Sequence, residues 1–163
     1  MRKTIFLLTL LFSFSSFASN WLDKTVEDRE GFRASKEEAQ QEKASLFFQE
    51  HGLIFFYSSL CPHCQAFAPV IKSFSDKEKA AVLPLSFDNQ AISGFPRYQE
   101  ASTEWVNIAY QGRAIEYPAL FIVNPKTKAL YPVSFGSMSI DELNARMRAL
   151  IPKIENHERK ENA

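Results

Sequence analysis

The chain has only two cysteines, and both lie in one four-residue motif, Cys61-Pro62-His63-Cys64. A small secreted domain that is stabilised by disulfides contains more cysteines, spread along its length. A spacer of two residues suits instead a disulfide that is made and broken during a reaction. The motif therefore predicts thiol–disulfide exchange as the chemistry of this chain.

Residues 1–18 have the three parts of a secretory signal peptide. Arg2 and Lys3 form a basic start, an apolar run follows, and Ser16-Phe17-Ala18 places small residues where a signal peptidase needs them. The alternative is an uncleaved membrane anchor, but the run is short for a span of about 20 residues. We expect cleavage after Ala18 and export to a bacterial periplasm, where disulfide exchange is supported.

The charge balance disfavours two classes of partner. Cleavage would remove Arg2 and Lys3, so the 19 basic residues fall to 17 against 19 acidic residues, and the net charge becomes about −2. Such a chain has no excess of positive charge for nucleic acid or an anionic membrane surface. No later apolar run in the sequence is long enough to cross a bilayer.

Composition divides the rest of the chain into three segments. Residues 19–45 are polar and rich in helix formers, which predicts a solvated helical lead-in rather than a partner-binding coil. Residues 46–152 carry the apolar runs and form one domain with a real core. Residues 153–163 are expected to be a polar tail.

The domain alternates apolar runs of strand length with amphipathic segments, which predicts an α/β fold. The alternation favours a parallel strand pair with a crossover, and the Asn124-Pro125 turn favours an antiparallel hairpin. We therefore expect a mixed central sheet with helices on both faces. Pro84 and Pro132 favour strand edges or bulges. The expected strands are residues 52–57, 81–87, 119–123 and 130–135; the expected helices follow Cys61, Ser102 and the capping box at Ser139, and residues 88–101 are expected to be a loop.

These features resemble the thioredoxin superfamily over roughly residues 46–152. The CxxC motif heads a helix after an apolar strand, and Pro69 lies five residues beyond the second cysteine, where the family has a helix-kinking proline. Tyr117-Pro118 precedes an apolar strand, and Gly136 precedes the last helix. The resemblance implies a thioredoxin-like fold with a cis peptide bond at Pro118.

A narrower resemblance is to the TrbB/TraF group, periplasmic thioredoxin-like proteins of F-type conjugative transfer, or type IV secretion, systems. TrbB-type members are described as disulfide isomerases, and the intact cysteine pair favours them over TraF-type members, which often lack it. The Pro62-His63 dipeptide is similar to that of DsbA oxidases, but the chain is too short before Pro118 for the DsbA helical domain. The resemblance is carried by residues 83–88, 94–96, 117–124 and 131–136.

The residues of the motif have distinct expected roles. Cys61 is the attacking thiolate, which a helix N-terminus and His63 would both stabilise. The alternative is that His63 is an exposed helix residue with little effect on the Cys61 thiol. Cys64 is buried and resolves the mixed disulfide, and Pro62 suits the first helical position.

Substrate contacts are expected on two further segments. The resemblance implies that the backbone at Tyr117, Pro118 and Ala119 pairs with an extended substrate segment. Phe95 and Tyr98, in the expected loop, are candidates to line a groove. Trp105 and Tyr110 are better explained as packing residues.

The chain departs from thioredoxins at Phe55, where they have a buried aspartate that assists proton transfer from the second cysteine. Exchange here is expected to use another base or water.

Metal binding is the main alternative reading of a CxxC motif, but zinc needs about four ligands. Only His51 and His63 could supply them, and we expect His51 and His157 to be exposed bystanders. No metal and no cofactor beyond the Cys61–Cys64 disulfide is therefore expected.

The direction of electron flow, as isomerase, oxidase or reductase, stays open at this point. A non-catalytic assembly module of the pilus machinery is the alternative function. The expected partners are cysteine-containing periplasmic or pilus-assembly proteins and a membrane thiol-redox partner.

Overall fold

The computed structural model describes residues 15–161 of the chain, and side chains from Arg29 onward together with that of Val26. Most of the expected signal peptide lies outside these residues, so its cleavage stays a prediction. The chain divides into two compact units, residues 1–40 and residues 41–163. Helix α1, Ser15–Glu50, contributes to both.

The first unit contains the part of α1 up to Gln40, where every described side chain is exposed, including Phe32. A helix that is polar all round buries no face, and the limits of the expected lead-in, residues 19–45, stay a prediction. The helix runs further than expected, through to Glu50. Within the second unit its last turns bury Phe47 and Phe48, which explains why the helix extends into the domain.

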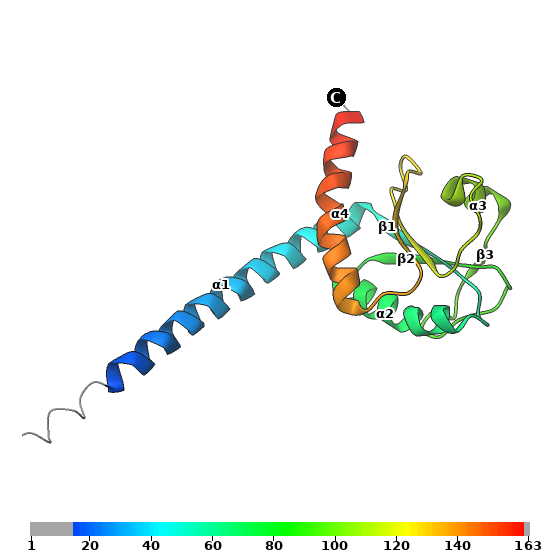
Figure 1. Cartoon of the computed structure of the whole chain (residues 1–163). Coiled ribbons are helices and arrows are strands. Elements are labelled where there is room, and N and C mark those ends of the chain that lie inside the picture. Colours follow the sequence, from blue (N-terminus) through cyan, green and yellow to red (C-terminus); the bar gives the residue numbers. More distant parts are fainter. Residues whose placement is uncertain (1–14, 162–163) are drawn as a thin grey trace, which may run out of the picture. The chain divides into compact units, whose positions relative to one another are not determined.

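The second unit is built on a five-stranded sheet with the strand order β3-β2-β1-β4-β5 (Figure 1). The β1–β2 and β2–β3 pairs are parallel, whereas β1–β4 and β4–β5 are antiparallel. The predicted mixed sheet, with its parallel crossover and its final hairpin, is therefore confirmed. The strands are β1 Gly52–Tyr57, β2 Ala81–Ser86, β3 Gln99–Glu100, β4 Ala119–Val123 and β5 Leu130–Phe135.

Strand β1 is buried on both sides, because helices cover both faces of the sheet. On one face, Leu53, Phe55 and Tyr57 of β1 pack with two helices. These helices are α2, Pro62–Glu78, and α4, Ile140–Glu161. Ile54 and Phe56 pack on the other face with the end of α3, Thr103–Tyr110. The predicted thioredoxin-like α/β fold is thus confirmed.

Both strand prolines lie where a missing N–H is tolerated. Strand β3 pairs only with Leu85 and Ser86, so the outer side of β2 is unpaired at Pro84. Pro132 lies in the edge strand β5, and the register of β4 against β5 shifts between Leu120 and Phe121. These positions agree with the sequence expectation for both residues.

The structure differs from the sequence expectations at both ends of the domain. The segment expected to be a polar tail continues α4 to Glu161, because Ile154 is buried and anchors it. His51, expected to be exposed, is buried and stacks on Phe47, and its Nε2 lies 3.1 Å from the Glu158 carboxylate. Strand β3 was not expected, because its two residues, Gln99 and Glu100, are polar and form no apolar run. They are a strand because they pair with β2.

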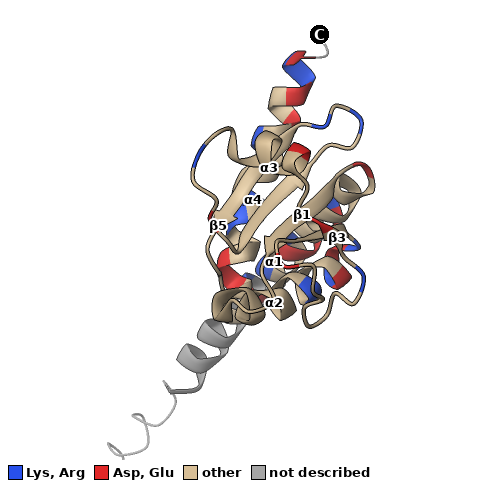
Figure 2. Ribbon diagram, turned by 90° about the vertical axis from the view of Figure 1, so that its right-hand side faces the viewer, with Lys and Arg blue, Asp and Glu red and all other residues tan. Residues whose placement is uncertain are grey.

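Charged residues lie on the helices and loops, and the strands are almost free of them (Figure 2). Strands β1, β2, β4 and β5 contain no Lys, Arg, Asp or Glu. The only charged residue of the five described strands is Glu100 of β3.

Candidate active site

The CxxC motif begins helix α2 directly after the most buried strand. Strand β1 ends at Tyr57, and three residues form the turn that leads to Cys61. The backbone N–H of Cys61 donates a 3.2 Å hydrogen bond to the Ser58 carbonyl and closes this turn. Pro62 occupies the first helical turn, where its missing N–H costs no helical bond. The sequence thus places Cys61 at a helix N-terminus, as expected.

Cys61 is the N-cap residue of α2, with φ −79° and ψ 117°. Its Sγ accepts a 3.4 Å hydrogen bond from the backbone N–H of Cys64. A thiolate at this atom would be stabilised by that bond and by the positive end of the helix dipole. Both cysteines are free thiols in this structure, and Cys61 is partly exposed.

Cys64 is fully buried, at 0% exposure, in the cluster that contains Phe55 and Phe67. Burial and a hydrogen bond with the Cys61 thiol raise the pKa of Cys64 to about 12. Its thiol is therefore protonated at neutral pH. The two cysteines are chemically unequal, with an accessible sulfur at the helix N-terminus and a protonated sulfur beneath it.

His63 and Pro62 are exposed on the first turn of α2. Within the part of the chain that the structure describes, the His63 side chain makes no hydrogen bond or ion pair. A role for His63 in tuning the motif therefore stays a prediction.

The Tyr117–Pro118 peptide bond is cis, as the family resemblance implied. Ala119 pairs with Phe56 near the end of β1, so Pro118 lies at the same end of the sheet as the turn before Cys61. Pro118 and Ala119 are buried, whereas Tyr117 is 45% exposed and contacts the Phe87 ring. The backbone of this segment and the CxxC motif therefore meet at one end of the sheet.

The two loop aromatics are placed differently from one another. Phe95 is buried and its ring contacts that of Phe55, so it is a core residue and not part of a surface groove. The expectation for Phe95 is corrected by its position in the core. Tyr98 is exposed, and its hydroxyl donates to the Asn89 carbonyl, so a role for Tyr98 in lining a groove stays a prediction. Tyr110 is buried, as expected for a packing residue.

Asp88 is a site residue that the sequence analysis missed. Its carboxylate accepts hydrogen bonds from Ser58, Ser59 and Ser86. Burial alone would raise the pKa of Asp88, but these hydrogen bonds outweigh it and hold the pKa well below its usual range. The signal in the sequence was the presence of serines at the ends of both neighbouring strands. No aspartate occupies position 55, where Phe55 packs instead against Phe67 and Phe95.

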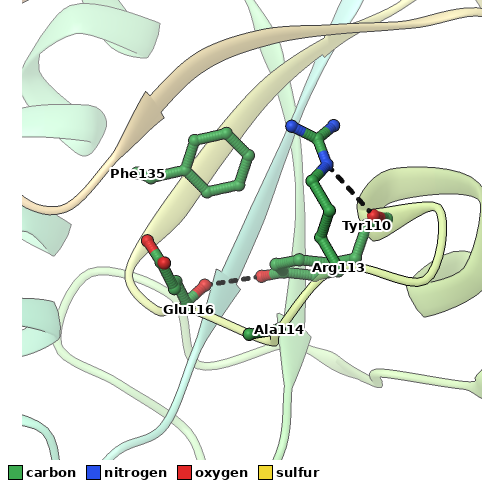
Figure 3. A pocket seen from close by; sticks show the side chains of 5 residues that line it. All are labelled: Tyr110, Arg113, Ala114, Glu116 and Phe135. Atoms are coloured by element: carbon green, nitrogen blue, oxygen red, sulfur yellow. Dashed lines mark hydrogen bonds between the residues drawn. The ribbon is translucent and has the colours of Figure 1, made fainter.

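A small pocket of about 120 Å³ adjoins the Pro118 segment on the β5 side (Figure 3). Phe135 pairs with Ala119, and the Tyr110 hydroxyl donates a 2.7 Å hydrogen bond to the Glu116 carbonyl. The pocket is lined by Tyr110, Arg113, Ala114, Glu116 and Phe135.

Among the side chains that the structure describes, those of Val26 and residues 29–161, no group of three or more His, Cys, Asp or Glu is placed to hold a metal ion. Among the helices of residues 15–161, none combines the length and apolar character needed to cross a membrane.

Comparisons with known proteins place the chain in a family. The family model TraF, described as F plasmid transfer operon protein, matches residues 26–148. The chain is 31% identical to Protein TraF of Escherichia coli strain K12 over 110 residues, which are 66% of this chain and 42% of that protein. It is 22% identical to Protein TrbB of the same strain over 99 residues, 61% of this chain and 55% of that protein. The chain thus spans about half the length of these relatives.

Among solved structures, the chain is similar to the thioredoxin-related protein from Neisseria meningitidis serogroup B. The TM-score is 0.44 at 15% identity, and the match covers 64% of this chain and 86% of that one. The TraF family model covers most of the chain, from the lead-in helix to α4. The chain therefore belongs to the TraF family.

Proposed function

We propose that this protein is a periplasmic thiol–disulfide oxidoreductase that works as a disulfide isomerase on cysteine-containing proteins of a conjugative transfer apparatus. The observation that carries the proposal is the inequality of the two cysteines. Cys61 caps a helix and is accessible, whereas Cys64 is buried and protonated. Thiol–disulfide exchange uses this combination, because one sulfur attacks the substrate and the other reacts only later, with the mixed disulfide.

The reaction begins when the Cys61 thiolate attacks one sulfur of a substrate disulfide. A bond forms between Cys61 Sγ and that sulfur, the substrate S–S bond breaks, and the other substrate sulfur leaves as a thiolate. Two outcomes then compete. The freed substrate thiolate, or another one in the substrate, attacks the mixed disulfide and releases Cys61, which is isomerisation. Alternatively Cys64 attacks Cys61 Sγ, so that the enzyme is oxidised and the substrate reduced.

The environment of Cys64 favours isomerisation over reduction. Only a thiolate attacks a disulfide, and the pKa of Cys64, raised to about 12 by burial and by Cys61, leaves little thiolate at neutral pH. Position 55, beneath the motif, holds a phenylalanine and no proton acceptor. Attack by Cys64 is therefore slow, and the mixed disulfide lives long enough for the substrate to rearrange.

The substrate class and the compartment rest on the family and on the sequence. The TraF family model is described as an F plasmid transfer operon protein, and one of the relatives is Protein TraF itself. The signal-like residues 1–18 support export, and the periplasm allows disulfide exchange. Exported transfer proteins with cysteines fit both observations.

The reduction potential of the Cys61–Cys64 pair tests the proposed direction. We expect a value near that of protein disulfide isomerase, about −180 mV, measured by equilibration with glutathione. A value near −270 mV, which is typical of thioredoxin, would contradict an isomerase and indicate a reductase. A value near −120 mV would indicate an oxidase.

A further inference from the structure

Asp88 fastens the turn that carries Cys61. It lies two residues beyond β2, and its Oδ2 accepts three hydrogen bonds from two consecutive residues of that turn. The Ser58 hydroxyl donates at 2.8 Å, the Ser59 hydroxyl at 2.9 Å and the Ser59 backbone N–H at 2.7 Å. Hydrogen bonds to a carboxylate are shorter and stronger than neutral ones, so this single oxygen fixes the turn.

The other carboxylate oxygen is fixed from the sheet side. The hydroxyl of Ser86, the last residue of β2, lies 2.8 Å from Asp88 Oδ1 and is itself fully buried. The Tyr57 hydroxyl donates a 2.9 Å hydrogen bond to the Gln90 carbonyl, which ties the same loop to the end of β1. Asp88 is therefore held between the ends of the two central parallel strands.

The motif is attached to the opposite side of the same turn. The Cys61 N–H donates to the Ser58 carbonyl at 3.2 Å, and the Gln65 side-chain amide donates to the Ser59 carbonyl at 2.8 Å. The turn thus donates to Asp88 on one side and accepts from α2 on the other. A shift of the Asp88 carboxylate would displace Cys61 through these bonds.

The charge of Asp88 acts on Cys64. The hydrogen bonds from the three serines keep the carboxylate ionised, because they lower its pKa against the effect of burial. Burial and the Cys61 thiol are the main causes of the raised pKa of Cys64, a backbone hydrogen bond at Ser58 lowers it, and the negative charge of Asp88 adds the smallest increase. An ionised carboxylate with such a low pKa does not take up a proton at neutral pH, so Asp88 does not replace the proton acceptor that Phe55 excludes.

The other titratable groups that act on Cys64 are neutral or belong to the motif. Cys61 lies on the same helix, and Tyr110 of α3 interacts with Cys64 from the other face of the sheet. Burial, together with Glu116 and Cys64, raises the pKa of Tyr110 far above neutrality, so it stays a neutral phenol. His63 is exposed on the first turn of α2. Among the groups that act on the pKa of Cys64, Asp88 is therefore the one that is ionised and lies outside the motif.

We propose that Asp88 is a positioning residue of the exchange reaction, which holds the Ser58–Ser59 turn under Cys61 and, by its negative charge, keeps Cys64 a thiol while the mixed disulfide exists. This rests on the proposed function. In the step that Asp88 delays, Cys64 Sγ loses its proton and bonds to Cys61 Sγ. The Cys61–substrate bond breaks, and the leaving substrate sulfur takes the electron pair and then a proton.

The first experiment measures how fast Cys64 resolves a mixed disulfide. The whole protein is loaded at Cys61 with a small peptide thiol, and release of the peptide is followed between pH 6 and 9. Asp88→Asn keeps the size of the side chain and removes its charge, so release at neutral pH should rise, and its pH profile should shift to lower pH. Asp141→Asn, an equal charge change at the exposed start of α4, should leave release unchanged.

A third variant separates charge from geometry. Ser59→Ala removes one hydroxyl donor and keeps the Asp88 charge, so the pH dependence of release should stay that of the unmodified protein while attack by Cys61 slows. If Asp88→Asn and Ser59→Ala change release to the same extent, Asp88 is merely structural and the proposal is wrong.

The second experiment needs no enzymatic activity. Cys64 is labelled with ¹³C at Cβ in a Cys61→Ser background, and its chemical shift is titrated with and without Asp88→Asn. The neutral Asp88→Asn variant should form the Cys64 thiolate at a lower pH than the protein with Asp88. Identical titrations would overturn the role of Asp88 even if exchange is active. A shifted titration in a protein that shows no exchange would instead support the charge effect and reject the proposed function.

Discussion

The sulfur of Cys61 accepts a hydrogen bond from the backbone N–H of Cys64. Through this contact the main chain of Cys64, and not its thiol, interacts with the Cys61 sulfur. The backbone N–H of Cys64 supports the Cys61 sulfur, which we propose attacks the substrate, while the Cys64 thiol stays buried and protonated. Because the stabilising donor is a main-chain group, it survives any substitution of the Cys64 side chain other than proline. The two cysteines can therefore be tested separately.

Cys64→Ser should retain attack and lose resolution. The N–H at position 64 still supports Cys61, so mixed disulfides with substrate should accumulate, visible as adducts by mass spectrometry without reductant. Cys61→Ser should form no adducts, because Cys64 is inaccessible. Adducts in Cys61→Ser at the level of Cys64→Ser would show that the assignment of the attacking residue is wrong.

His63→Ala should make the disulfide less oxidising. A histidine beside Cys61 favours the thiolate and hence the reduced form, and His63 is exposed, so the fold should be unaffected. The measurement is the reduction potential, with His157→Ala as the matched control on an exposed position of α4. An unchanged potential would mean that the helix N-terminus alone stabilises Cys61.

The strands could be predicted from the sequence to within a residue because they are apolar runs bounded by turn residues. Strand β3 could not, since Gln99 and Glu100 acquire their conformation from pairing with the end of β2. His51 and Phe95 were misplaced for a related reason. Their partners, Glu158 and Phe55, lie far away in the chain, and no local pattern records such contacts.

The motif itself was readable because its chemistry lies in four consecutive residues. Asp88 was not, because its hydrogen-bond donors Ser58 and Ser59 lie about thirty positions earlier in the chain. A single aspartate after a strand is ordinary in any loop. Only the parallel pairing of β1 with β2 brings the ends of these strands, and hence the three residues, together.

Phe95→Ala should destabilise the fold by about 3–5 kcal/mol, the cost of emptying a buried aromatic position. Tyr98→Ala should cost about 0.5–1.5 kcal/mol, since Tyr98 is exposed and loses one hydrogen bond to Asn89. Urea unfolding of the two variants checks both values. Equal losses of stability would contradict the core position of Phe95.

The free energy of unfolding should decrease in acid because of Glu158. Burial would raise the pKa of Glu158, but hydrogen bonds from Asn124, His51 and Tyr131 lower it below its ordinary 4.5. A pKa lowered by folding contributes stability above the unfolded value, and that contribution is lost as pH falls through the folded value. Unfolding free energies measured from pH 7 downward should therefore decrease below pH 4.5.

Glu158→Gln provides the comparison for this pH dependence. At pH 7 it should be about 1–3 kcal/mol less stable than the unmodified protein, because buried partners lose a charged acceptor. The difference should shrink in acid. Glu161→Gln, at an exposed position of the same helix, should follow the unmodified protein. A Glu158→Gln profile parallel to that of the unmodified protein at every pH would refute the assignment.

Reactivation of scrambled ribonuclease tests the central claim, disulfide isomerisation at Cys61, most directly. The account predicts that the whole protein restores ribonuclease activity in a glutathione buffer, that Cys64→Ser keeps part of this activity, and that Cys61→Ser has none. Ribonuclease reactivation by Cys61→Ser at the rate of the unmodified protein, or no reactivation by any of the three, would contradict the account and leave a non-catalytic assembly module.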